Sequence, residues 1–149
     1  MKERRDLRVY TGGTFDLPHR GHIDLLGWCR EIAGEDGEVV VSLNTDEFVE
    51  RYKGKRPVIK YGDRKAILEE FTSLVDRVVE NVGGEDSKQT IMNVAPDIIV
   101  VGSDWLFKDY MKQMDFTPEW LEEQNIALCY IPRHRNISTT NIKEVVKNE

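Results

Sequence analysis

Short apolar segments alternate along this chain with longer segments whose apolar residues recur at helical spacing. The apolar runs at residues 39–43 and 97–102 are rich in β-branched residues, which is typical of strands buried on both faces. The clearest helical pattern covers residues 23–33. Because a helix that joins two parallel strands packs onto their sheet, the repeated alternation predicts an α/β fold with helices on both faces of a doubly wound parallel sheet.

The same pattern predicts a Rossmann-like sheet of five strands. We expect strands at residues 7–10, 39–43, 78–79, 97–102 and 127–131. Helices are expected to begin near His19, Thr45, Pro118 and Ser138, and one further helix ends before Pro96. The apolar residues Ile67, Leu68, Phe71, Leu74 and Val75 predict another helix, which begins near Gly62. No internal repeat or linker interrupts the chain, so residues 1–149 are expected to form a single domain. In such sheets ligands bind beyond the carboxyl ends of the strands, where the strand order reverses.

The charge of the chain is unevenly distributed. The formal net charge is −6, but residues 51–65 hold seven basic side chains and one acidic one, so that segment carries +6 and the rest of the chain −12. A positive loop on an acidic protein suits a compact anion such as a nucleoside triphosphate better than a long nucleic acid. The alternative for such a run is a solvated loop with no ligand.

The composition also favours a particular compartment. No apolar run approaches the ~20 residues of a membrane span, and the charged start precedes no signal-like segment. Cys29 and Cys129 both lie within apolar patterns, which favours reduced thiols over a disulfide. We therefore expect a cytoplasmic protein with no membrane partner and no nucleic-acid partner.

Residues 11–22 stand where the first strand meets the first helix and contain two of the three histidines. Backbone N–H groups at a helix start are unpaired and favour anions, and Gly13 and Gly21 let a ligand approach closely. His19 and His22 are three residues apart, so they share one face of the first helical turn and can both donate to a phosphate. A metal site and a purely structural turn are the alternatives, although a metal site would need further ligands.

Residues 133–140 form a second polar segment, just before the last expected helix. Arg133 and Arg135 can hold anions in a bidentate manner, and three hydroxyl residues, Ser138, Thr139 and Thr140, stand at the helix start. One hydroxyl suffices as an N-cap, which is the structural alternative.

The segment Gly13-Thr14-Phe15-Asp16 followed by His19-Arg20-Gly21-His22 resembles the nucleotidyltransferases that carry an HxGH signature. Residues 133–140 resemble the RTEGISTT motif of the cytidylyltransferases in that superfamily, with His134, Arg135 and Asn136 in place of Thr-Glu-Gly. The resemblance is strongest to cytidylyltransferases that act on glycerol 3-phosphate, with Ser103 replacing an aspartate in their Gly-Asp-Asp-Trp segment. It leaves residues 110–121 (Tyr110 to Leu121) as an insertion without a counterpart.

The resemblance implies transfer of CMP from CTP to a small phosphate ester, glycerol 3-phosphate, with release of pyrophosphate. Mg²⁺ would travel with the triphosphate, assisted by Asp16, and no dedicated metal site is expected. The implied catalytic residues are His19, His22, Lys55 and Arg133. The implied nucleotide site adds Gly13, Thr14, Phe15, Gly21, Asp104, Ile137, Ser138, Thr139 and Thr140, and the acceptor site consists of Asp16, Lys53, Arg64 and Lys88. A homodimer is also implied.

Two other functions remain open from the sequence. Residues 53–58 and the C-terminal helix also resemble adenylyltransferases that act on heptose 1-phosphate, and archaeal FMN adenylyltransferases have a similar loop. ATP would then replace CTP. A function of another class is a nucleotide-binding regulator that has lost catalysis, but both histidines and both loop lysines, Lys53 and Lys55, are present.

Overall fold

The computed structural model describes residues 6–83, 85–103, 109–132 and 139–148. Its centre is a parallel sheet in the order β3-β2-β1-β4-β5, which confirms the predicted fold class. The strands are β1 (Arg8–Gly13), β2 (Glu38–Asn44), β3 (Arg77–Asn81), β4 (Ile98–Gly102) and β5 (Ala127–Ile131). The order reverses at β1, which pairs with β2 on one side and β4 on the other.

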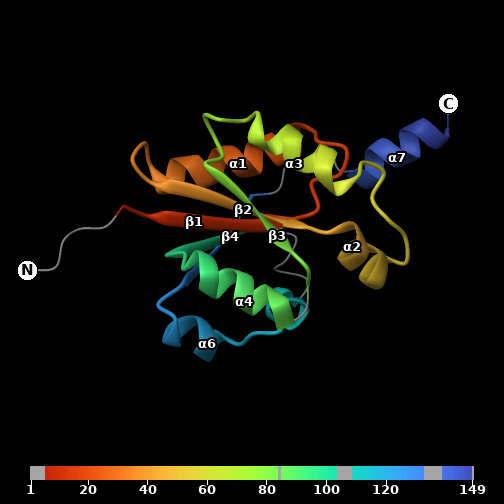
Figure 1. Cartoon of the computed structure of the whole chain (residues 1–149). Coiled ribbons are helices and arrows are strands. Elements are labelled where there is room, and N and C mark those ends of the chain that lie inside the picture. The colour runs from red at the N-terminus through yellow and green to blue at the C-terminus, as the bar shows by residue number, and fades with distance from the viewer. Residues whose placement is uncertain (1–5, 84, 104–108, 133–138, 149) are drawn as a thin grey trace, which may run out of the picture.

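Helices cover both faces of this sheet (Figure 1). On one face lie α1 (Arg20–Ala33) and α3 (Tyr61–Glu69), and on the other α4 (Glu85–Val94), α5 (Tyr110–Gln113) and α6 (Pro118–Glu123). Neighbouring strand residues alternate between the two cores because side chains along a strand point to opposite faces. Val9 packs with Cys29 of α1, whereas Tyr10 packs with Ile91 of α4.

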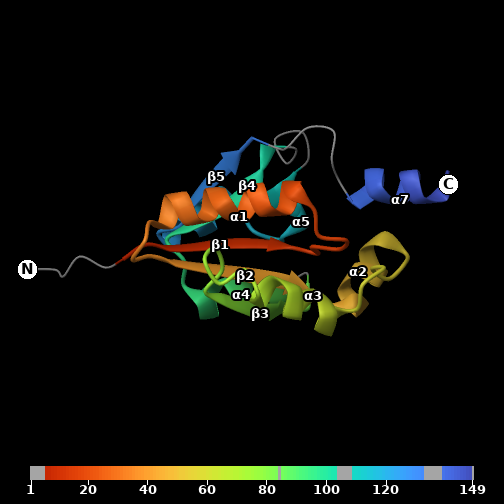
Figure 2. The ribbon, with the colours of Figure 1, turned by 90° about the horizontal axis from the view of Figure 1, so that it is seen from above.

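The remaining helices lie at the carboxyl end of the sheet. Figure 2 shows α2 (Asp46–Lys53) and α7 (Thr139–Lys147) at the same end of the molecule, beyond the strands. Thr45 caps α2 through a hydrogen bond from the N–H of Phe48 to its hydroxyl, as its sequence predicted. Both elements therefore border the region where a parallel sheet binds its ligands.

One expected element is shorter than its pattern suggested. The apolar residues from Ile67 to Val75 predicted a continuous helix, but α3 ends at Glu69. The following residues form turns, in which the N–H groups of Leu74 and Val75 bond to the carbonyl of Phe71. Thr72 and Ser73 disfavour a helix interior, and the turns still allow Leu74 and Val75 to pack against the core.

The insertion at residues 110–121 extends the core on the α4 face. Tyr110, Met114, Phe116 and Leu121 are buried against the sheet, and the Phe116 ring stacks on that of Trp120 at 5.3 Å. It is therefore an integral part of the domain. Among the described residues, no helix is long and apolar enough to cross a membrane. Cys29 and Cys129 are both free thiols.

Candidate nucleotidyl-transfer site

A cavity of about 930 Å³ opens beyond the carboxyl ends of the strands. It is lined by residues from the turn after β1, from the start of α1, from α2 and its following loop, from α5, and from α7. The predicted residues Gly13, Thr14, Phe15, Asp16, His19, Gly21, His22, Lys53 and Lys55 are all among them. Residues far apart in the sequence thus meet where the strand order reverses.

The turn after β1 has a strained backbone that presents the start of α1. Phe15 and Leu17 have positive φ angles of 51° and 48°, a conformation uncommon for residues other than glycine. The Phe15 ring is buried, and a Cβ atom added at Gly13 would lie 3.0 Å from it. Glycine at position 13 therefore makes room for the ring that supports the turn.

His19 and His22 cap α1 reciprocally. The N–H of Gly21 donates to His19 Nδ1 at 3.0 Å, and the N–H of His19 donates to His22 Nδ1 at 3.2 Å. The two rings stack with their centroids 3.9 Å apart. Because each Nδ1 accepts a hydrogen bond, the neutral rings carry their protons on Nε2, which is the atom that can donate to a ligand.

Burial keeps His22 neutral near pH 7. Desolvation lowers its pKa from 6.5 to about 4, with a further lowering by His19 that outweighs the opposing charge of Asp16. In the ligand-free protein this ring is thus a neutral hydrogen-bond donor. A polyanion in the cavity would favour the protonated ring and raise that pKa.

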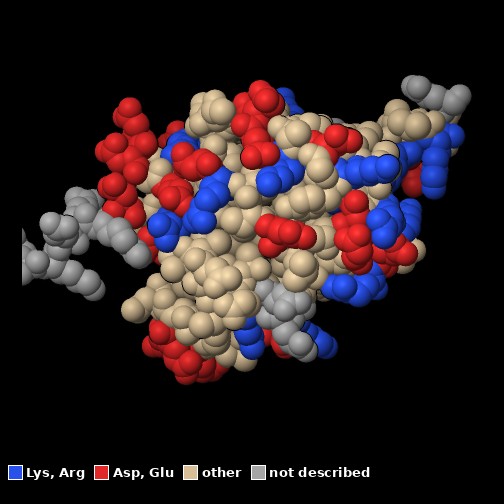
Figure 3. Space-filling view, viewed as in Figure 1, with Lys and Arg blue, Asp and Glu red and all other residues tan. Residues whose placement is uncertain are grey.

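Asp16 fastens the lysine-bearing loop to the turn. Its carboxylate accepts hydrogen bonds from the N–H groups of Val58 and Ile59 at 2.8 and 2.9 Å, and Lys143 Nζ of α7 lies 3.8 Å from it. The same loop carries Lys55, and the last turn of α2 carries Lys53. Both lysines are exposed at the cavity, and Figure 3 shows basic side chains interspersed with acidic ones at this end of the molecule.

The structure places two predicted acceptor residues away from the cavity. Arg64 is fully buried, and it donates to the carbonyls of Thr14 and Ile59 and to Asp46. It therefore supports the cavity wall from behind, and the expectation that it contacts an acceptor is wrong. Lys88 lies on α4 and is not among the residues that line the cavity, so its contact with the acceptor stays a prediction.

The Arg64 pair also affects Asp46. Burial by itself raises the pKa of Asp46, but the hydrogen bond from Arg64, the N–H of Tyr61 and the charges of Arg64 and Arg56 together hold the pKa below its usual value. The ionised carboxylate is thus the partner that Arg64 requires.

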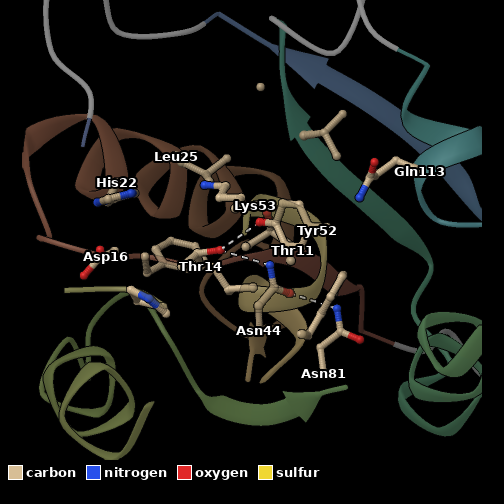
Figure 4. Close-up of a pocket in the computed structure, with 18 of the residues that line it drawn as sticks. Thr11, Thr14, Asp16, His22, Leu25, Asn44, Tyr52, Lys53, Asn81 and Gln113 are labelled. Atoms are coloured by element: carbon tan, nitrogen blue, oxygen red, sulfur yellow. Dashed lines mark hydrogen bonds between the residues drawn. The ribbon is translucent and has the colours of Figure 1, made fainter. Parts of the chain in front are cut away.

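Sequence reasoning missed a row of uncharged polar side chains along the cavity. Asn44 and Asn81 are the last residues of β2 and β3, and they are directly opposite each other in the sheet register. Figure 4 shows their amides in line with Thr14 and Tyr52. Their position at strand ends was the available signal, since parallel strands present their last residues to the ligand site.

Several predicted site residues lie outside the described part of the chain: Asp104, Arg133, Ile137 and Ser138. His134, Arg135 and Asn136 lie there too. Thr139 is the first residue of α7, and the side chain of Thr140 is exposed and does not line the cavity. The described residues contain no cluster of three His, Cys, Asp or Glu side chains that could hold a metal ion.

Known proteins share this chain's sequence and fold over most of its length. The profile of the cytidylyltransferase-like family matches residues 10–145. The glycerol-3-phosphate cytidylyltransferase of Bacillus subtilis is 38% identical, covering 93% of this chain and 96% of its own length. The FAD synthase of Korarchaeum cryptofilum is 34% identical, covering 94% and 92%.

A solved structure agrees with these sequence matches. The lipopolysaccharide core biosynthesis protein from Thermoplasma volcanium superposes with a TM-score of 0.66 and 29% identity, over 88% of this chain and 98% of that one. The family match spans both the histidine-capped turn and the lysine loop that line the cavity. The chain belongs to the cytidylyltransferase-like family of nucleotidyltransferases.

Proposed function

We propose that this protein transfers CMP from CTP to glycerol 3-phosphate and releases pyrophosphate. The observation that carries the proposal is the stacked histidine pair at the start of α1, which opens onto the same cavity as Lys53 and Lys55. Relatives named glycerol-3-phosphate cytidylyltransferase, 35% to 38% identical over more than nine-tenths of this chain, support this choice of nucleotide and acceptor.

The chemistry requires no nucleophile from the protein. A phosphate oxygen of the acceptor attacks the α-phosphorus of CTP in line, the bond from that phosphorus to the bridging oxygen of the β-phosphate breaks, and the electron pair leaves with pyrophosphate. Catalysis then consists of positioning and charge stabilisation. His19 and His22 donate from Nε2 to the phosphates, where negative charge develops, and the lysines neutralise the triphosphate and the attacking phosphate.

Mg²⁺ is part of the proposal as an ion carried by the triphosphate. Magnesium usually binds through substrate phosphates with few protein ligands. Asp16, one of the two carboxylates among the described residues that line the cavity, already accepts two backbone N–H groups, so it fits an outer contact to the hydrated ion better than direct coordination. Arg133 and residues 137–140, which follow β5, complete the proposed nucleotide site, together with Asp104 after β4. A homodimer, implied by the family resemblance, can be tested by sedimentation equilibrium.

A second candidate is adenylyl transfer from ATP to FMN. The FAD synthases of Korarchaeum cryptofilum and Pyrococcus abyssi are 34% and 32% identical over nearly the whole chain, which favours this alternative over one acting on heptose 1-phosphate. Its reaction at the α-phosphorus would be the same. The two candidates differ in the base and in the acceptor.

Pyrophosphate release distinguishes the candidates. The purified protein is assayed with CTP or ATP against glycerol 3-phosphate, phosphocholine, phosphoethanolamine, heptose 1-phosphate and FMN. We expect turnover with CTP and glycerol 3-phosphate, and a fall of about 10²–10³ in kcat for His19→Ala or His22→Ala with the fold retained. Preference for ATP and FMN would reject the cytidylyltransferase assignment, and no turnover with any pair would favour an inactive nucleotide-binding regulator.

A further inference from the structure

An uncharged polar row crosses the β2–β3 side of the cavity. Asn81 Nδ2 donates to Asn44 Oδ1 at 3.0 Å, and Asn44 Nδ2 donates to Thr14 Oγ1 at 3.1 Å. The hydroxyls of Thr14 and Tyr52 lie 3.3 Å apart (Figure 4). At the far end, Asn81 Oδ1 accepts from the N–H of Gly83 and the hydroxyl of Ser87. This second set of bonds fixes the orientation of the row.

Asn44 and Asn81 each carry one more amide N–H group than the bonds within the row use. Asn44 and Asn81 are 8% and 1% exposed, and both line the cavity. An amide nitrogen carries two N–H groups, and among the described residues each of these nitrogens makes one hydrogen bond. A buried N–H group without a partner is unfavourable, so a ligand that supplies an oxygen there gains affinity.

The row lies on the side of the phosphates away from the proposed nucleotide site. The histidine pair stands after β1 at the centre of the sheet, whereas Asp104 and residues 133–140 follow β4 and β5. Asn44 and Asn81 end β2 and β3 on the other side. In-line attack on the α-phosphorus requires the acceptor to enter opposite the leaving pyrophosphate and clear of the nucleoside. If the base lies toward β5, the β2–β3 side of the cavity is the side left open for the acceptor. Lys53, adjacent to Tyr52 at the end of α2, can hold its phosphate there.

We propose that Asn44, with Asn81 and Thr14 behind it, recognises the free hydroxyl groups of a polyol phosphate acceptor. This inference rests on the proposed function and adds the means by which the acceptor is selected. Paired amides and hydroxyls both donate to and accept from an alcohol. They carry no charge for the trimethylammonium group of phosphocholine or the ammonium group of phosphoethanolamine.

The test compares acceptors that differ by one hydroxyl. Glycerol 3-phosphate, propane-1,2-diol 1-phosphate and propane-1,3-diol 1-phosphate are assayed with CTP by pyrophosphate release. A site built around a substrate hydroxyl discriminates strongly against an analogue that lacks it, so we expect wild-type kcat/KM to favour glycerol 3-phosphate by about 10-fold or more over at least one diol phosphate. Asn44→Ala should reduce that preference to about 3-fold or less, with the KM for CTP unchanged within about 2-fold.

Two further variants separate recognition from general damage. Asn44→Asp keeps the size and removes the donor, so it should lose the same preference. Asn93→Ala is the matched control, since Asn93 lies exposed on α4 and bonds only to Gln89 among the described residues. It should behave as wild type. Thermal unfolding checks that each variant is folded.

The outcomes separate this inference from the function on which it rests. Normal turnover of glycerol 3-phosphate with an unchanged hydroxyl preference in both Asn44 variants would overturn the inference alone. A rise in the KM for CTP as large as the rise in the KM for glycerol 3-phosphate would also overturn it. Turnover of FMN with ATP, and not of glycerol 3-phosphate with CTP, would overturn both the proposed acceptor and this inference. If no pair turns over, calorimetric titration with glycerol 3-phosphate decides, and equal dissociation constants for wild type and Asn44→Ala would overturn the inference.

Discussion

Although Arg64 belongs to the basic segment at residues 51–65, replacing it with methionine should strongly lower the free energy of unfolding. The guanidinium is fully buried and makes three hydrogen bonds: to the Thr14 carbonyl at 2.6 Å, to the Ile59 carbonyl at 2.8 Å and to Asp46 Oδ1 at 2.7 Å. It thereby connects the turn after β1, the lysine loop and the start of α2. Methionine fills most of the volume but supplies none of these donors.

The magnitude follows from the carboxylate that is left behind. The Asp46 side chain is 15% exposed, and removing one partner of a buried ion pair costs about 3–5 kcal/mol because the other charge remains without compensation. For a chain of this length, about 1 kcal/mol lowers Tm by roughly 2–4 °C, so the expected fall is about 6–20 °C. The lysine loop should also lose its fixed place, which lowers kcat/KM.

Urea unfolding followed by circular dichroism measures this loss, and a double-mutant cycle identifies its cause. Asp46→Asn removes the charge from the other partner. The double variant should lose less than the two single losses combined, by about 1–3 kcal/mol, because the two side chains are in contact. A stability of Arg64→Met within about 1 kcal/mol of wild type, accompanied by a raised KM for the acceptor, would refute this reasoning and restore Arg64 as a substrate contact.

Three further predictions concern the turn and the loop. Burial lowers the pKa of His22 from 6.5 to about 4, so the unfolded state takes up a proton before the folded state as pH falls through this range. The free energy of unfolding should therefore drop between pH 6.5 and pH 4 by up to about 3 kcal/mol. In urea titrations at several pH values, His22→Gln should remove this pH dependence, and an unchanged dependence would contradict the prediction. Gly13→Ala should destabilise the protein by about 1–3 kcal/mol, because the added Cβ pushes the Phe15 ring. Gly12→Ala is the control and should destabilise the protein less, since its added Cβ has no neighbour nearer than 3.6 Å. Equal melting temperatures for the two variants would count against this account. Lys55→Ala should weaken CTP binding by about 10-fold in calorimetry without lowering Tm. Lys60→Ala serves as its control, because Lys60 is exposed and does not line the cavity. Equal CTP affinities for the two variants would exclude the role given to Lys55.

The regular part of the fold could be read from the sequence. Short apolar runs rich in β-branched residues, such as residues 39–43, are typical of strands buried on both faces, and they predicted the strands of a parallel sheet. The end of α3 was misjudged because Leu74 and Val75 reach the core from turns as well as they would from a helix. Spacing alone does not distinguish these two arrangements.

The candidate site was likewise predictable from the sequence only in part. Local order along the chain determined the pair His19 and His22, because residues three apart at a helix start meet through the helix itself. The charge of residues 51–65 determined that a positive loop exists, but it did not separate Lys55, at the cavity, from Arg64, behind its wall.

The tertiary structure alone decided which residues stand opposite one another. Asn44 and Asn81 are 37 residues apart, and nothing in their local sequence pairs them. They meet because β2 and β3 align in register at their carboxyl ends. Sequence periodicity reports whether a side chain faces the core, whereas partners brought together by strand register and chain crossing depend on the whole sheet. The sequence therefore determined the sheet and the histidine-capped turn, and the tertiary structure decided what surrounds them.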